Sequence, residues 1–206
     1  MPPLTSSQLL SPAIVPCLAF SLLMLALTLL PEALRQQLAF NSERVLSGQW
    51  WRLWTGHWLH LNGWHWAMNS GALVLIVWIF RDVLRLIPVF CWWCATPLLI
   101  SLGFLLFDQP IDYYAGLSGA IYGLLVLGLL LGWRGNFWLH LLVLLVVAGR
   151  LGWEQHPNYD PLYLQQWIDG AVHVNAHLFG ALSGIMLALL MVLVARVRAG
   201  SITRRR

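Results

Sequence analysis

Three groups of polar residues that can carry out chemistry interrupt an otherwise apolar sequence. They are His57, His60, His65 and Asn69; Gly116-Leu117-Ser118-Gly119; and His173, Asn175 and His177. Strongly polar groups inside membrane segments are costly and often mark functional sites. A serine hydroxyl becomes a good nucleophile when a nearby imidazole accepts its proton. Ser118 and His177 therefore suggest a nucleophile and its base.

The residues around Ser118 predict a site that stabilises an oxyanion. Ser118 stands at the expected start of a helix, where free backbone N–H groups point outward and suit a negative charge. His65 and Asn69 are four residues apart, so they share a helix face and can add two hydrogen-bond donors. Tyr122 lies one turn after Ser118 and can stack on the imidazole of His177.

Glycines at helical spacing predict that two helices pack closely around this pair. They form two sets, Gly116, Gly119 and Gly123, and Gly180 and Gly184. The second set shares a helix face with His177. Because small residues let membrane helices approach closely, we expect the helices carrying the two sets to hold Ser118 against His177.

The histidine-rich first group also admits a metal site. Three histidines with a carboxylate can bind zinc or iron, which makes His57, His60 and His65 candidate ligands. The expected helices nearby contain no acid except Asp169 at an edge, and the spacing is not that of an HExxH motif. We therefore expect no metal and no cofactor, with a metal-dependent membrane enzyme as an alternative.

The composition requires a membrane bundle to position these groups. Of 206 residues, 59% are hydrophobic and 10% are charged, whereas soluble domains carry roughly 25% charged residues. This excludes a soluble globule, a nucleic-acid binder and a disordered regulator. We expect one all-α domain over residues 1–206, with six transmembrane helices in contact with the lipid bilayer. The expected spans cover about 13–30, 58–80, 86–107, 117–133, 137–151 and 171–197.

The positive charges predict the orientation of this bundle. The chain has 12 basic residues, all arginine, and five of them lie between Arg196 and Arg206. With a cytoplasmic N-terminus, eight of the arginines fall on the cytoplasmic side, so the positive-inside rule places both termini there. The three polar groups then lie on the outer side. We expect residues 31–57, which are rich in tryptophan, to form a loop partly within the outer leaflet.

Taken together, these motifs resemble those of the rhomboid intramembrane serine proteases. The resemblance is carried in order by Trp51-Arg52, His65-x-x-x-Asn69, Gly116-Leu117-Ser118-Gly119 with Tyr122, and Ala176-His177-x-x-Gly180-x-x-x-Gly184. It implies a six-helix rhomboid fold and a dyad of Ser118 and His177 without a third acid. It also implies an oxyanion hole of His65, Asn69 and the Ser118 N–H, with Tyr122 stacked on His177. The expected lateral gate is residues 137–151 and the loop through Asp169.

Two short segments are most similar to the rhombosortase branch of that family. They are Gly48-Gln49-Trp50-Trp51-Arg52 and Gly152-Trp153-Glu154-Gln155, in a chain of compact size. This resemblance implies an enzyme of a bacterial inner membrane whose active site opens to the periplasmic side. Its expected substrates are exported proteins with a C-terminal sorting tail, made of a Gly-Gly motif, a hydrophobic span and a basic end.

Two further functions remain open beside this one. The first is a general rhomboid protease that acts on other single-span membrane proteins. The second is a non-catalytic rhomboid-like protein that binds membrane helices. A serine-directed fluorophosphonate that labels Ser118 separates an enzyme from a binder, and metal analysis with chelators tests the metal-dependent alternative.

Overall fold

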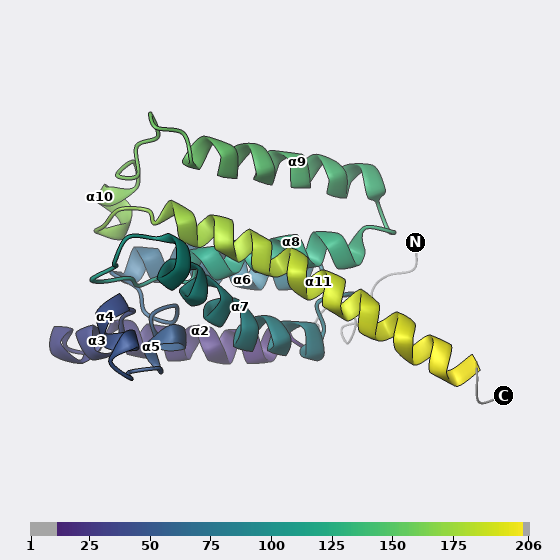
Figure 1. Cartoon of the computed structure of the whole chain (residues 1–206), viewed down its shortest axis with the longest axis horizontal. Helices are drawn as coiled ribbons and strands as arrows, with labels where there is room; N and C mark the ends of the chain where they lie inside the picture. Colours follow the sequence, from purple (N-terminus) through teal and green to yellow (C-terminus); the bar gives the residue numbers. More distant parts are fainter. Residues whose placement is uncertain (1–11, 204–206) are drawn as a thin grey trace.

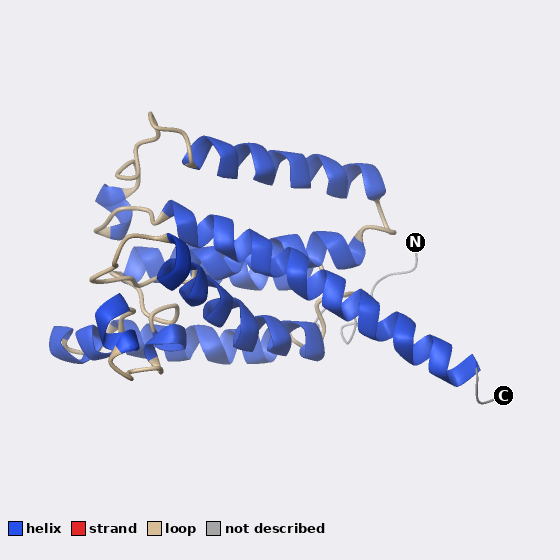
Figure 2. Ribbon diagram, viewed as in Figure 1, coloured by secondary structure: helices blue, strands red, loops and turns tan. Residues whose placement is uncertain are grey.

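The computed structural model describes residues 12–203, which form helices joined by loops (Figure 2). Their bounds are α2 (Ile14–Thr28), α3 (Glu32–Leu38), α4 (Ser42–Leu46), α5 (Arg52–Thr55), α6 (Gly63–Ile79), α7 (Leu86–Phe107), α8 (Ser118–Gly132), α9 (Phe137–Glu154), α10 (Gln165–Ile168) and α11 (Val174–Thr203). The last three arginines of the expected cytoplasmic tail lie outside the described residues.

The bundle is built around α8. Helix α11 packs along it most extensively, α6 and α7 also contact it, and α2 packs against α6. Helix α9 lies at the edge of the bundle, and the short helices α3, α4, α5 and α10 gather at one end of it (Figure 1). Ser118 begins α8 at that same end. The central helix of the bundle therefore begins with Ser118, the candidate nucleophile.

The six expected spans coincide with the six long helices, and the bounds differ by three residues or more in three of these helices. Helix α6 begins at Gly63 instead of residue 58, because the side chain of Asn62 accepts a hydrogen bond from the His65 N–H at 2.8 Å and caps the helix there. Helix α9 continues to Glu154, and α11 runs from Val174 to Thr203.

Three described helices are long and apolar enough to cross a membrane. They are α7, α9, and α11 over Val174–Ala199, while α2 and α8 are shorter apolar helices of 15 residues each. A count of six spans therefore remains a prediction. Many large apolar side chains on α9 and α11 are exposed, such as Leu145 and Leu189 at 61% and 66%. Such surfaces are stable where the surrounding solvent is lipid.

The expected first loop folds into α3, α4 and α5 and packs on the bundle. Arg52 is 5% exposed, and its guanidinium donates to the carbonyls of Gln36, at 2.8 Å, and Ala39. Phe40 pairs with Tyr114 through two backbone hydrogen bonds of 3.0 and 2.9 Å. This loop thus holds the segment that leads into Ser118.

Candidate active site

The segment before α8, which aims Ser118, is fixed by the conformation of Gly116 and by two hydrogen bonds to its backbone. Gly116 adopts φ +151°, a conformation that favours glycine, and a Cβ there would lie 3.0 Å from the His65 ring. Its N–H donates to the Gly56 carbonyl at 3.1 Å. Its own carbonyl accepts the Tyr114 hydroxyl at 2.8 Å. A larger side chain would be strained at this φ and would press on the His65 ring, so this position sets how closely Ser118 and His65 approach.

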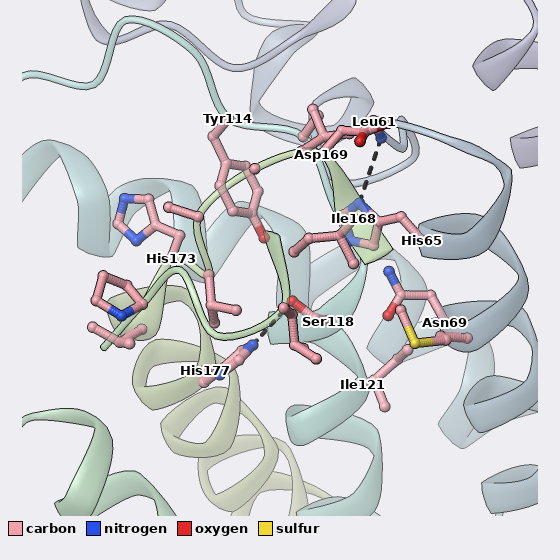
Figure 3. A pocket seen from close by; sticks show the side chains of 18 of the residues that line it. Leu61, His65, Asn69, Tyr114, Ser118, Ile121, Ile168, Asp169, His173 and His177 are labelled. Atoms are coloured by element: carbon pink, nitrogen blue, oxygen red, sulfur yellow. Dashed lines mark hydrogen bonds between the residues drawn. The ribbon is translucent and has the colours of Figure 1, made fainter. Parts of the chain in front are cut away.

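The structure places Ser118 and His177 in hydrogen-bond contact. Ser118 Oγ lies 3.0 Å from Nε2 of His177, which lies one turn into α11 (Figure 3). The Tyr122 ring stacks on the imidazole with 4.5 Å between centroids and 24° between planes. His177 is 6% exposed. This geometry suits proton transfer from the hydroxyl to the ring.

The contact depends on the close approach of α8 and α11. A Cβ on Gly119 would lie 2.5 Å from the carbonyl oxygen of Ala176, the residue before His177. A Cβ on Gly180 would collide with the Gly119 carbonyl, and one on Gly184 with that of Gly123. Only glycine at these positions lets the two backbones touch.

His65 and Asn69 present donors on the side of the cavity opposite His177. Nδ1 of His65 accepts from the Leu61 N–H at 3.4 Å, so in the neutral ring the proton resides on Nε2. Nδ2 of Asn69 is buried and has no hydrogen-bond partner within the described part of the chain. An unpaired buried donor is costly, which points to a group that arrives with the substrate.

These residues line one cavity of about 790 Å³. Its walls come from α6, α8, the first turn of α11 and the segment from Pro161 to Asn175 (Figure 3). His173 and Asn175 lie at its border, where Asp108 binds Asn175 and lies 3.8 Å from His173 Nε2. Burial lowers the pKa of His173, and Asp108 opposes that shift.

His57 and His60 are not part of this cavity. Both are fully buried, and Nε2 of His57 contacts Ser101 Oγ at 2.9 Å. Within the first polar group, His65 and Asn69 line the cavity, whereas the ring of His60 is buried behind it and packs edge to face on the His65 ring with 5.0 Å between centroids. Among residues 12–203, no three His, Cys, Asp or Glu side chains converge in a way that could hold a metal ion.

Glu154 is the site residue that the sequence interpretation missed. Its Oε2 lies 2.9 Å from Nδ1 of His177, and the residue is 3% exposed. A buried carboxylate therefore contacts the candidate base, a contact that the predicted dyad of Ser118 and His177 did not include. A signal existed in the spacing of Val147, Leu151 and Glu154, which places the acid on the buried face of α9.

Comparisons with known proteins place this chain in a family. A family model described as "Rhomboid domain" matches residues 47–194, which include every candidate residue named above. A protein of Bacillus subtilis (strain 168) named "Putative rhomboid protease YdcA" is 28% identical over 153 residues, covering 72% of this chain and 70% of that protein. The chain is thus a multi-pass membrane protein that belongs to the rhomboid family, and it is a serine-type intramembrane endopeptidase.

Proposed function

We propose that this endopeptidase cuts its substrates with Ser118 as nucleophile and His177 as general base. The observation that carries the proposal is the 3.0 Å contact between Ser118 Oγ and His177 Nε2 at the wall of the cavity. The unpaired amide of Asn69 supports it, because this donor lines the same cavity. No cofactor is required for this chemistry.

The steps follow from this arrangement. Nε2 of His177 takes the hydroxyl proton as Oγ of Ser118 bonds to the scissile carbonyl carbon. The oxygen that becomes negative is met by Nε2–H of His65, the amide of Asn69 and the backbone N–H of Ser118. The protonated imidazole then gives its proton to the leaving amine, and an acyl-enzyme remains on Ser118. Water, or another nucleophile, releases the acyl group through the reverse sequence.

The arginines support an orientation in which the cavity opens to the periplasmic side of a bacterial inner membrane. The turn that carries Arg81 and Arg85 lies beside the far end of α8, because Phe80 and Leu84 border Gly128. Gly128 is about 15 Å along the helix from Ser118 at 1.5 Å per residue. The positive-inside rule assigns the arginine end to the cytoplasm and both termini with it.

The proposed substrates are exported proteins that end in a sorting tail with a Gly-Gly motif, a hydrophobic span and a basic end. The positive-inside rule places the basic end of such a tail in the cytoplasm, so the Gly-Gly motif lies near the outer boundary of the membrane. That is the proposed depth of Ser118. The segments from Gly48 to Arg52 and from Gly152 to Gln155 support this choice through their similarity to rhombosortases.

The nucleophile is tested by Ser118→Ala in cells that also express a tailed substrate. We expect the variant to fold and cleavage to fall to background, because no other described hydroxyl contacts His177. Ser47→Ala is the matched control, since this serine is exposed on the first loop and its hydroxyl contacts only the Arg44 carbonyl. Cleavage that persists in Ser118→Ala refutes the mechanism.

The substrate class is tested by mass spectrometry of the mature C-terminus of the tailed protein. We expect a cut near the Gly-Gly motif with wild-type enzyme and an intact tail with Ser118→Ala. A matched single-span protein without the Gly-Gly motif is expected to remain whole. If both are cut equally, the enzyme is a general rhomboid protease, and if a fluorophosphonate fails to label Ser118, the chain is a binder.

A further inference from the structure

We infer that Glu154 is a positioning residue that completes a relay of Ser118, His177 and Glu154, and that α9 brings it to the site. The inference rests on the proposed roles of Ser118 and His177. It adds a third residue on a different helix, and with it a link between the packing of α9 and the orientation of the base.

The carboxylate of Glu154 is fully engaged. Its side chain is 0% exposed, with Oε2 at 2.9 Å from His177 Nδ1 and Oε1 at 2.9 Å from Arg150 Nε. A buried carboxylate is stable only when such partners satisfy it. As an acceptor, it holds the imidazole proton on Nδ1, which leaves the lone pair of Nε2 directed at Ser118. The acid therefore selects the tautomer that can act as a base.

Arg150 holds this carboxylate from the opposite side. It lies one turn before Glu154 on α9, and its Nη2 donates to the hydroxyls of Tyr159 and Tyr163 at 2.8 and 2.7 Å. The guanidinium also lies over both rings, 5.3 and 5.2 Å from their centroids. Tyr163 lines the cavity, so a chain of contacts runs from the cavity wall to the base.

Helix α9 is attached to the bundle mainly at this end. Its buried residues are Val147, Leu151 and Glu154, which occupy one face at helical spacing. Val147 and Leu151 pack with Val126 of α8 and Ala181 of α11. The relay is therefore complete only while the C-terminal half of α9 packs against these helices.

The first test compares Glu154→Gln with Glu154→Asp in the purified full chain. An amide can donate to Nδ1 and favour the wrong tautomer, so we expect kcat and the rate of fluorophosphonate labelling to fall about 10² to 10⁴-fold. KM should stay within about threefold, because the acid contacts His177 and Arg150 and does not line the cavity. Aspartate keeps the negative charge but is one methylene shorter, so its carboxylate lies farther from His177. Its kcat and labelling rate should therefore be intermediate. Glu43→Gln, on the exposed face of α4, should match the wild type.

The order of the variants separates positioning from a structural role. A structural role predicts that activity follows thermal stability, with the isosteric Gln milder than the shorter Asp. A positioning role predicts wild type above Asp above Gln in labelling rate, whatever their stabilities. A folded Glu154→Gln with wild-type labelling overturns the inference. Persistent cleavage in Ser118→Ala would instead overturn the proposed function.

A second pair of substitutions keeps the inference testable if Glu154→Gln does not fold. Tyr159→Phe combined with Tyr163→Phe removes the hydrogen bonds that these two hydroxyls accept from Arg150 and leaves Glu154 in place. We expect the labelling rate of Ser118 to fall about three- to tenfold, in line with two lost hydrogen bonds to a charged group. An unchanged rate would show that the network around Arg150 does not act on the base.

Discussion

Gly119→Ala tests whether the contact between α8 and α11 sets the geometry of the catalytic pair. The new Cβ would lie 2.5 Å from the carbonyl oxygen of Ala176. A carbon–oxygen contact of about 3.3 Å is the close limit, so the helices must separate by about 0.8 Å. Gly119 and Ala176 directly adjoin Ser118 and His177. The hydrogen bond of 3.0 Å between their side chains should therefore open to near 4 Å, by the same order of displacement.

The expected result is a large loss of activity with a small change in stability. A misplacement of about 1 Å costs on the order of 10²-fold in rate, so we expect fluorophosphonate labelling of Ser118 to slow by about 10 to 100-fold. Overpacking costs about 1–3 kcal/mol, and replacing a helical glycine by alanine returns about 1 kcal/mol. The midpoint of thermal unfolding should therefore fall by only a few degrees.

The matched control is Gly71→Ala on α6, where an added Cβ meets no atom within 4 Å. It should keep the wild-type labelling rate and gain slightly in stability from helix propensity. If Gly119→Ala labels as fast as Gly71→Ala, the close approach of the two helices does not control the pair. Equal losses in both variants would show that any added methyl group disturbs the bundle.

Three other perturbations test the surroundings of the site. Asn69→Ala should lower kcat by about 10² to 10³-fold with little change in KM, because the amide is needed mainly when the oxyanion forms; an unchanged kcat would remove Asn69 from the oxyanion hole. Burial, with smaller contributions from neighbouring histidines, lowers the pKa values of His57 and His60 from 6.5 to about 3. The unfolded chain therefore takes up these protons first, and the unfolding temperature should fall from pH 6.5 towards pH 4, whereas a flat or rising profile contradicts this assignment. Arg52→Ala leaves buried carbonyls unpaired and should lower the free energy of unfolding, measured by denaturation, by about 2–4 kcal/mol. A loss below about 1 kcal/mol would show that the first loop does not depend on Arg52.

The sequence was informative for features that lie within a single helix, such as which of its side chains share a face. Helical spacing alone placed His65 and Asn69 on one face of α6, and it placed Gly180 on the face of His177. Apolar runs located the long helices to within a few residues at most ends. These features are local, since a periodicity of 3.6 residues determines which side chains share a face whatever the helix packs against.

What the sequence could not provide depends on the rotation and depth of separate helices. Glu154 is one of several acids near the ends of expected spans, and nothing in its own segment says that it faces His177 on α11. His57 and His60 stand close to His65 in sequence, yet both are fully buried outside the cavity, and the His60 ring packs on the far side of the His65 ring. Contacts of this kind come from tertiary packing, which local patterns do not determine.

The placement of Glu154 has a consequence for the order of events in cleavage. Ser118, His177 and the donors of α6 belong to helices that are packed on several sides, whereas the acid sits on α9, which buries three side chains. If α9 moves outward to admit a substrate span, Glu154 leaves His177 and the base loses the partner that fixes its tautomer. Entry of the substrate span and proton transfer from Ser118 to His177 then cannot occur at the same time. Cleavage must therefore wait until α9 packs against the bundle again. A substrate whose span does not let α9 return would bind and remain uncut, which gives the enzyme selectivity beyond the residues at the scissile bond.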